Sequence, residues 1–167
     1  MRTKIFVVAI LSVFLIGFSA CKIEGDSNYT PKLSVYGWAK VNSDSLPLMS
    51  SATGGVTLDS LHVNDTVTVY VFANAFMNFL TKFEYTVDND SVLEVLVVDS
   101  IRKEFDESSD FVNGKIVMRE NVFGMRYPFQ FVTKKPTEKT TVKFEVESTA
   151  EKVPNKSGLI LEFPIKP

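Results

Sequence analysis

The feature that most constrains the fold of this chain is an alternation of apolar and polar residues with a period of two, which runs from Leu33 almost to the C-terminus. In residues 141–146, for example, Val142, Phe144 and Val146 alternate with polar side chains. This period is typical of β-strands that bury one face, and no long stretch has the 3.6-residue period of an amphipathic helix. The alternation predicts short strands over residues 33–41, 56–61, 66–71, 82–87, 92–99, 115–119, 127–133, 141–146 and 159–165.

Turn-forming residues separate these segments at intervals of roughly 8–15 residues, for example Gly54-Gly55 and Asn113-Gly114. Short strands with regular turns predict an all-β fold, and specifically an antiparallel β-sandwich of roughly 7–9 strands. Pro164 has no N–H to donate to a neighbouring strand, so we expect the last strand to lie at an edge of its sheet.

Parts of this pattern resemble bacterial Ig-like domains. Residues 63–69 resemble the opening of the second strand of those domains, and residues 140–147 and 158–166 together resemble their closing hairpin. The resemblance implies an Ig-like sandwich with Greek-key connections. The disulfide-bonded core of antibody domains is absent, because the chain has a single cysteine.

The N-terminus has the pattern of an export signal. Arg2 and Lys4 precede an apolar run over residues 5–18, which as a helix would span about 21 Å, less than the roughly 30 Å hydrocarbon core of a bilayer. A positive start, a short apolar run and then small residues predict a secretory signal peptide over residues 1–20. The alternative is an ordinary buried N-terminal helix.

The end of this segment, Phe18-Ser19-Ala20-Cys21, resembles the lipobox of bacterial lipoproteins, with Phe18 where the usual pattern has Leu. Cys21 is the only cysteine, so it has no partner for an internal disulfide. The resemblance, to lipoproteins of the Bacteroidetes type, implies cleavage before Cys21 and attachment of lipid to it. A simple cleavage site with an incidental cysteine is the alternative.

The resemblance also implies a location and a domain plan. Lys22 stands where an inner-membrane retention signal would have Asp, which favours the outer membrane, and residues 22–26 partly resemble a surface-export tag, so both periplasmic and surface-facing orientations stay open. Polar, turn-forming residues follow, so we expect an acylated cysteine and flexible tether over 21–31 and one β-domain over 32–167.

Residues suited to catalysis are scarce, so we expect no catalytic site, no cofactor and no enzyme. His62 is the only histidine, and Ser-His or Cys-His catalysis would depend on it. Ser100 and Lys103 match the Ser-x-x-Lys motif of penicillin-binding enzymes, but the companion motifs of that class do not occur. A hydrolase is therefore the weakest of the alternatives.

Metal and nucleic-acid binding are not expected either. Residues 88–90 could open a calcium loop, but Val92 and Leu93 follow where an EF-hand requires a ligand and a glycine. Four carboxylates over 104–110 are interpreted as a solvated loop. The formal net charge of −2 offers no basic excess for phosphates, which argues against a nucleic-acid partner.

Aromatic residues provide the more informative signal. The alternation in 33–41 places Tyr36, Trp38 and Lys40 together on the polar face of a strand. If that face is exposed, the two rings form a strip suited to stacking on sugars; the alternative is that a loop or the tether covers them. These three residues are the candidate glycan-binding site of a non-catalytic binding or accessory module.

A second apolar segment, Phe76-Met77-Asn78-Phe79-Leu80, falls in a loop position between two predicted strands. It either caps one end of the sandwich or forms a contact surface. With predicted edge strands at 33–41 and 158–166, it favours the alternative function, a structural or assembly subunit of a cell-envelope complex. The expected partners are thus the membrane, through the lipid anchor, and a glycan or an envelope protein.

Six of the nine aspartates are followed by Ser or Thr, against about 1.5 expected by chance. Where an aliphatic residue comes next, the pattern resembles the O-glycosylation acceptor of exported Bacteroidetes-type proteins. Local turn chemistry, in which Asp bonds the backbone before a strand, is the alternative. The candidate acceptors are Ser45, Ser60, Thr66, Ser91 and Ser100.

Overall fold

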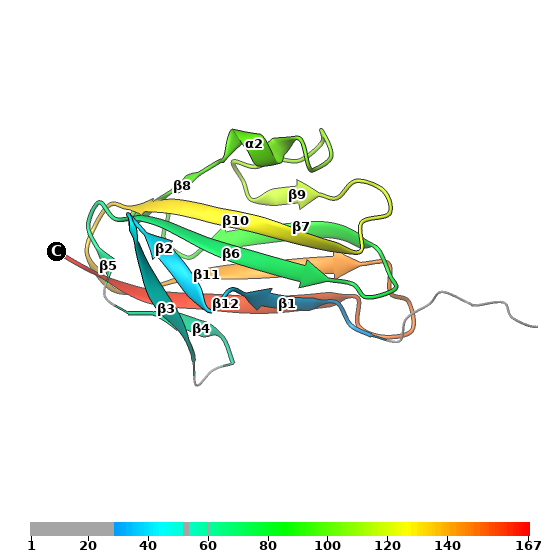
Figure 1. The fold of residues 1–167 in the computed structure, drawn as a ribbon, viewed down its shortest axis with the longest axis horizontal. Helices are drawn as coiled ribbons and strands as arrows, with labels where there is room; N and C mark the ends of the chain where they lie inside the picture. The colour runs from blue at the N-terminus through cyan, green and yellow to red at the C-terminus, as the bar shows by residue number, and fades with distance from the viewer. Residues whose placement is uncertain (1–28, 52–53, 60) are drawn as a thin grey trace, which may run out of the picture.

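The computed structural model describes residues 29–51, 54–59 and 61–167, so the predicted signal peptide, Cys21 and Ser60 lie outside the described residues (Figure 1). More than half of the described residues lie in strands and only one short helix occurs among them, which confirms the all-β prediction. The elements are β1 (Lys32–Val35), β2 (Trp38–Val41), β3 (Asp44–Ser50), β4 (Val56–Leu58), β5 (Leu61–His62), β6 (Thr66–Asn74), β7 (Leu80–Val87), β8 (Leu93–Leu96), α2 (Asp99–Arg102), β9 (Lys115–Val117), β10 (Gly124–Thr133), β11 (Thr137–Ser148) and β12 (Lys156–Lys166).

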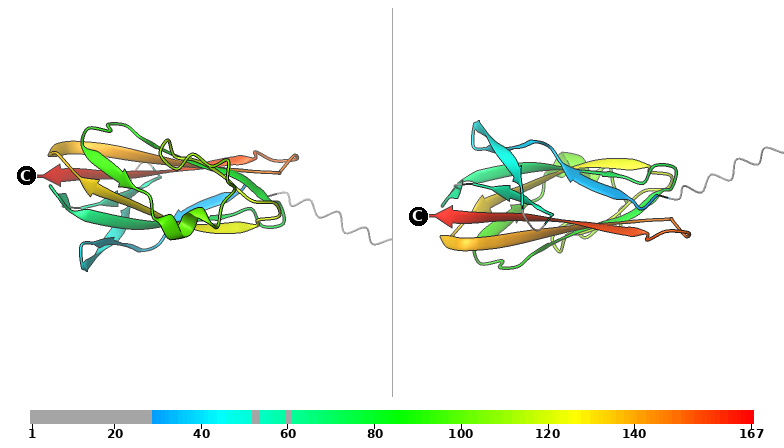
Figure 2. Two further views of the ribbon diagram at one scale, coloured as in Figure 1. Left: turned by 90° about the horizontal axis from the view of Figure 1, so that it is seen from above. Right: turned by 90° about the horizontal axis from the view of Figure 1, so that it is seen from below.

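The strands form one hydrogen-bonded sheet of twelve strands that curls on itself, rather than the predicted sandwich of two separate sheets with seven to nine strands in all. Strands β8, β10, β6, β1 and β2 make one half, and β9, β7, β11, β12, β4 and β5 make the other. β3 joins the halves because it pairs with β2 at one end and with β4 at the other. Seen from above and below, the two halves face each other as layers (Figure 2).

Most pairs are antiparallel, as predicted, but the prediction that the last strand is an edge is wrong. β12 pairs with β11 on one side and with β4 and β5, both parallel to it, on the other. β4 pairs at Leu161 and Glu162 and β5 pairs at Ile165 and Lys166. Pro164 falls between these two partners, where the missing N–H costs no ladder bond.

The core lies between the two halves, and aromatic rings fill it. The ring centroids of Phe129 on β10 and Phe144 on β11 are 5.1 Å apart, and so are those of Phe131 on β10 and Phe163 on β12. The four side chains are completely or almost completely buried. The period of two placed them inward, because successive residues of a strand point to opposite faces.

The predicted strand 33–41 is two strands. β1 and β2 both pair with β6, but the register changes by two residues between them, with Val35 opposite Val71 and Lys40 opposite Thr68. The chain leaves β6 at Tyr36 and Gly37, and β2 turns into the hairpin with β3. The hairpin was not predicted, because Pro47 interrupts the alternation of 44–50.

The predicted strand 92–99 ends early, at Leu96, and the chain continues into α2 and a series of turns before β9. Ile101, Phe105 and Phe111 from this segment are buried. The ring of Phe105 lies 6.0 Å from that of Tyr127 on β10, so the segment covers the core at the side where the curled sheet is open (Figure 1).

Candidate binding face

The rings of Tyr36 and Trp38 lie on the outer face of the β1–β2–β6–β10 half. Tyr36 is 43% exposed and Trp38 is 46% exposed. Their centroids are 4.4 Å apart and their planes are perpendicular, an edge-to-face arrangement that aromatic pairs prefer. Within the described residues, no loop covers either ring. Tyr36 and Trp38 share this face because they are two residues apart, and the two-residue change of register between β1 and β2 preserves that alternation.

Two more rings and a guanidinium extend this surface across β6 and β10. The ring of Phe72 lies 6.2 Å from that of Tyr36. The guanidinium of Arg126 lies 4.2 Å from the ring centroid of Tyr70 and 6.0 Å from that of Phe72. Register accounts for these contacts, since Phe72 stands opposite Arg126 on one side and opposite Ser34 on the other.

Lys40, the third predicted member of the site, is exposed at the other end of the same surface. It stands opposite Thr68 on β6, and Gln130 on β10 donates a hydrogen bond from Nε2 to the Thr68 hydroxyl at 3.1 Å. We use the name aromatic face for a set of outward side chains from residues 32–40, β6 and β10. Its members are Lys32, Ser34, Tyr36, Trp38, Lys40, Thr68, Tyr70, Phe72, Asn74, Arg126 and Gln130.

The outer face of the other half has a different character. There, charged side chains of both signs alternate along β7, β11 and β12 and form ion pairs, such as Lys143 with Glu145 at 3.1 Å and Lys156 with Glu147 at 3.3 Å. Paired surface charges of this kind contribute little energy but keep a face solvated. The rings are therefore concentrated on one outer face of the body.

An open hollow of about 620 Å³ adjoins the rings at one end of the aromatic face. Lys32, Phe72, Asn74 and Arg126 line it, and Gly124 leaves it free of a side chain on β10. A volume of this size is within the range of small-ligand sites. The hollow continues the aromatic face, since Phe72 and Arg126 belong to both.

His62 lies at the end of β5, beside the turn that leads into β6. His62 is exposed, and its contacts come from its backbone: its N–H donates to Asp65 Oδ2 at 2.8 Å, and its carbonyl accepts from the Thr133 hydroxyl at 2.6 Å. Ser100 lies in α2 and is exposed, as is Lys103 just beyond that helix.

The carboxylate of Asp88 serves the fold. It accepts hydrogen bonds from the Thr140 hydroxyl at 2.5 Å and from the Thr141 N–H and hydroxyl at 2.9 Å each. Partial burial acts to raise the pKa of Asp88, but these hydrogen bonds outweigh it and lower the pKa below its ordinary value. Asp88 thereby ties the turn after β7 to the start of β11.

Two carboxylates of the acidic loop likewise hold turns. Asp106 Oδ1 accepts from the Ser108 N–H and hydroxyl, and Asp110 accepts from the Asn113 backbone and side-chain N–H groups. These hydrogen bonds lower the pKa of both carboxylates. No group of three or more potential metal ligands gathers anywhere in the described residues.

The candidate glycosylation sites differ in exposure. Ser45, Ser91 and Ser100 are exposed, Thr66 is half-buried at the start of β6, and Ser60 lies outside the described residues. Local turn chemistry operates at Asp65, which receives the His62 N–H, and at Ser91, whose hydroxyl donates to Asn89 Oδ1 at 2.8 Å. Use of any of these sites stays a prediction.

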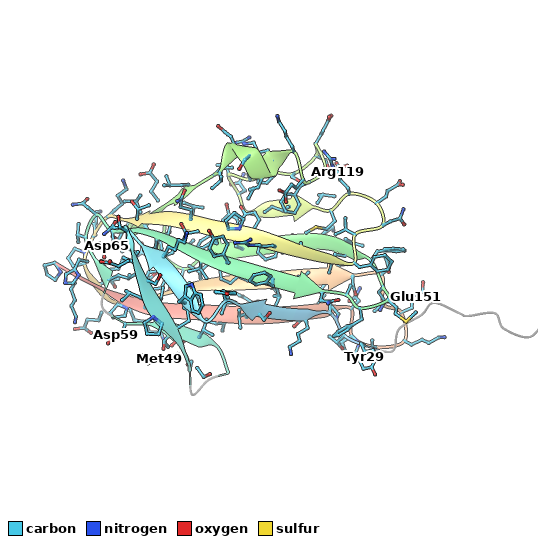
Figure 3. The ribbon with its side chains drawn as sticks, in the orientation of Figure 1. Tyr29, Met49, Asp59, Asp65, Arg119 and Glu151 are labelled. Atoms are coloured by element: carbon cyan, nitrogen blue, oxygen red, sulfur yellow. The ribbon has the colours of Figure 1, made fainter. Side chains whose placement is uncertain are left out.

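The segment Phe76–Leu80 contains both buried and exposed residues. Leu80 is buried, and the ring of Phe79 packs 4.7 Å from that of Phe123, so these residues cap one end of the body. Phe76 and Met77 are exposed, and Phe76 lies 5.2 Å from Tyr29. Figure 3 labels Tyr29 at this end, where the described chain begins.

Sequence reasoning missed Tyr70, Phe72 and Arg126. The alternation in 66–74 does place Tyr70 and Phe72 opposite the buried valines, and that signal was available. Arg126 could not be assigned to the same surface, because its place there depends on β10 pairing with β6, a contact between segments about 50 residues apart.

Comparison with known proteins adds no assignment: no family model matches the sequence, and no curated protein is significantly similar to it. Across the described ranges, no helix is long and apolar enough to cross a membrane.

Proposed function

We propose that this chain is an exported lipoprotein, anchored to the outer membrane through lipid on Cys21, whose β-domain is a non-catalytic module that binds glycans. The positive start, short apolar run and lone cysteine support the anchor. A single acyl chain gives only marginal membrane binding, so lasting attachment requires several chains. The lipobox resemblance implies that Cys21 carries several chains.

The observation that carries the binding function is the exposed pair of Tyr36 and Trp38. Large aromatic side chains are usually well buried, and two of them exposed side by side on a strand surface mark a contact site. Sugar rings present flat apolar faces between hydroxyls, so they stack on such rings while Lys40 and Gln130 offer hydrogen bonds to the hydroxyls.

The proposal includes an Ig-like scaffold, and the strand order supports it. One half runs β1/β2, β6, β10, β8, and the other runs β12, β11, β7. Constant-type Ig domains have the same arrangement, with the first, second, fifth and fourth strands in one sheet and the third, sixth and seventh in the other. The β2–β3 hairpin, β4, β5 and β9 are additions to that plan.

A glycan array tests the binding function. The full-length protein should bind at least one oligosaccharide class, and Trp38→Ala should reduce the affinity by about tenfold or more, as removal of a central aromatic anchor does. Ile160→Ala is the matched control, since Ile160 is 38% exposed on the outer face of the other half. Binding that survives Trp38→Ala, or no binding to any glycan, contradicts the proposal.

The exposed end of the body favours a second candidate function, assembly with an envelope protein. Phe76, Met77 and Phe123 are 41%, 54% and 49% exposed at this end. Pull-down of the native protein from detergent-solubilised membranes should then recover a stoichiometric partner, which the double variant Phe76→Ser/Met77→Ser would lose. Recovery of the same partner by the double variant would rule out this surface.

A further inference from the structure

We propose that the ligand of the aromatic face is an acidic oligosaccharide, one carrying carboxylate or sulfate groups, and that Arg126 binds the acidic group. This inference deepens the proposed glycan-binding function and rests on it. It concerns the chemical class of the sugar, which the exposed rings alone do not specify.

The first argument is the balance of charge on the aromatic face. The outward positions of β1, β2, β6 and β10 carry three cations, Lys32, Lys40 and Arg126, and no carboxylate occurs among those described positions. The chain as a whole has more acidic than basic residues. On the neighbouring strands of the sheet, Glu94 on β8 pairs with Lys134, and Asp44 on β3 stands opposite Val41. A surface of this composition attracts an anion and disfavours a cation.

The second argument concerns the contacts of the Arg126 guanidinium. Its guanidinium is held by the rings of Tyr70 and Phe72, and no carboxylate in the described chain forms an ion pair with it. Stacking on an aromatic face fixes the guanidinium plane but leaves its N–H donors at the edge. These N–H donors form a planar fork, and a carboxylate or sulfate can accept two parallel hydrogen bonds from it. The cost in side-chain entropy is small because the guanidinium is already positioned.

The third argument is the hollow beside Arg126. Lys32 and Arg126 both line it, from β1 and β10 on either side of β6, about 10 Å apart across the strands. Ser34 and Asn74 add uncharged hydrogen-bonding groups. From Asn74 to Thr68 the face extends about 20 Å along β6, so a chain of several sugars can reach from this hollow past the Tyr36–Trp38 pair to Lys40.

Matched pairs of oligosaccharides test this inference. Isothermal titration compares oligogalacturonate with its methyl ester, and sulfated with desulfated carrageenan oligomers, so that one arm probes carboxylates and the other sulfates. We expect the full-length protein to bind the acidic member of at least one pair about tenfold or more tighter than its neutral partner, with affinity that falls as salt is raised.

Variants at Arg126 identify the group responsible. Arg126→Gln should weaken binding of the acidic sugar by about tenfold to a hundredfold and affect the neutral member much less, while Arg126→Lys should have an intermediate effect because it keeps only the charge. Arg102→Gln is the control: Arg102 also lies over a ring, Phe111 at 5.4 Å, but away from the aromatic face. Thermal unfolding confirms that each variant is folded.

The outcomes separate this inference from the function on which it rests. Equal binding of acidic and neutral members, lost with Trp38→Ala, overturns the acidic specificity and leaves glycan binding in place. Tight binding of acidic sugars that Arg126→Gln does not change also overturns the inference. Binding of no sugar in either pair overturns the acidic specificity, while the glycan array decides separately whether the protein binds glycans at all. Binding only to phosphatidylglycerol vesicles contradicts both, because it would assign the surface to lipid.

Discussion

The ring of Trp38 meets the ring of Tyr36 edge-on, 4.4 Å between centroids, on a surface where neither ring closes the core. The core of this half is made instead by the opposite side chains of the same strands, such as Ala39 and Val71, which are fully buried. The two faces of the sheet thus differ: one side holds the fold together and the other carries the exposed rings.

This separation predicts that Trp38→Ala changes stability little. The side chain is 46% exposed and leaves no cavity in the core when it is truncated, so we expect the free energy of unfolding to fall by about 1 kcal/mol or less. Chemical denaturation of both proteins measures the difference. A loss of several kcal/mol would show that the ring supports the fold.

Phe129→Ala should behave in the opposite way. Phe129 is fully buried and contacts rings from three strands, with centroids 5.0 Å from Tyr85, 5.6 Å from Phe131 and 5.1 Å from Phe144. Its removal leaves a large cavity between the two halves, which should cost about 3–5 kcal/mol. The same denaturation experiment tests this, and a cost near that of Trp38→Ala would mean that the halves are not packed as described.

Two buried tyrosines predict a loss of stability at alkaline pH. Burial raises the pKa of both Tyr127 and Tyr85, and the Tyr85 hydroxyl donates to the Phe111 carbonyl at 2.5 Å. Below pH 10 both are protonated in the folded and unfolded states. Above pH 10 the unfolded chain loses these protons and the folded chain keeps each one until its raised pKa is reached, so stability falls as pH rises. The slope reaches about 1.4 kcal/mol per pH unit for Tyr127, and Tyr85 adds to the fall up to its own raised pKa.

Tyr127→Phe removes one of these two groups. The free energy of unfolding of this variant, measured between pH 9 and 11, should therefore decline less steeply than that of the unmodified chain, whatever its value at neutral pH. Identical slopes for the two proteins would contradict the buried, protonated state of Tyr127.

The lipid anchor predicts a change in partitioning. In the native host, Cys21→Ser should remove palmitate labelling and move the protein from the membrane fraction, because the thiol is the proposed attachment point. Ser27→Ala is a matched control in the tether. Unchanged labelling or membrane partitioning of the cysteine variant would rule out a lipoprotein.

The period of two predicted which side chains of the regular strands point inward. It placed Val142, Phe144 and Val146 inward, and all three are buried. It could not predict which strands are neighbours, because pairing depends on contacts between distant segments. For this reason the sequence did not predict the parallel partners of β12. The predicted edge position of β12 is wrong, because the strand lies between β11 on one side and β4 and β5 on the other.

Only some residues of the candidate site were predictable, because the others belong to it through pairing between distant strands. Tyr36, Trp38 and Lys40 follow from local alternation in one segment. Arg126 belongs to the site only because Phe72 on β6 lies between it and β1, and no local pattern carries that information. The segment 97–114 was the hardest to predict, since its turns depend on side-chain hydrogen bonds such as those of Asp106 and Asp110.

The fluorescence of Trp38 tests the central claim most directly. Trp38 is the only tryptophan in the chain, so the emission of the full-length protein reports on the aromatic face alone. Titration with an oligosaccharide that binds should shift the emission to shorter wavelength in a saturable way, because a stacked sugar displaces water from the ring, and the midpoint should match the dissociation constant from calorimetry. A glycan that binds by calorimetry and leaves this emission unchanged would show that the ligand binds elsewhere and would contradict the account.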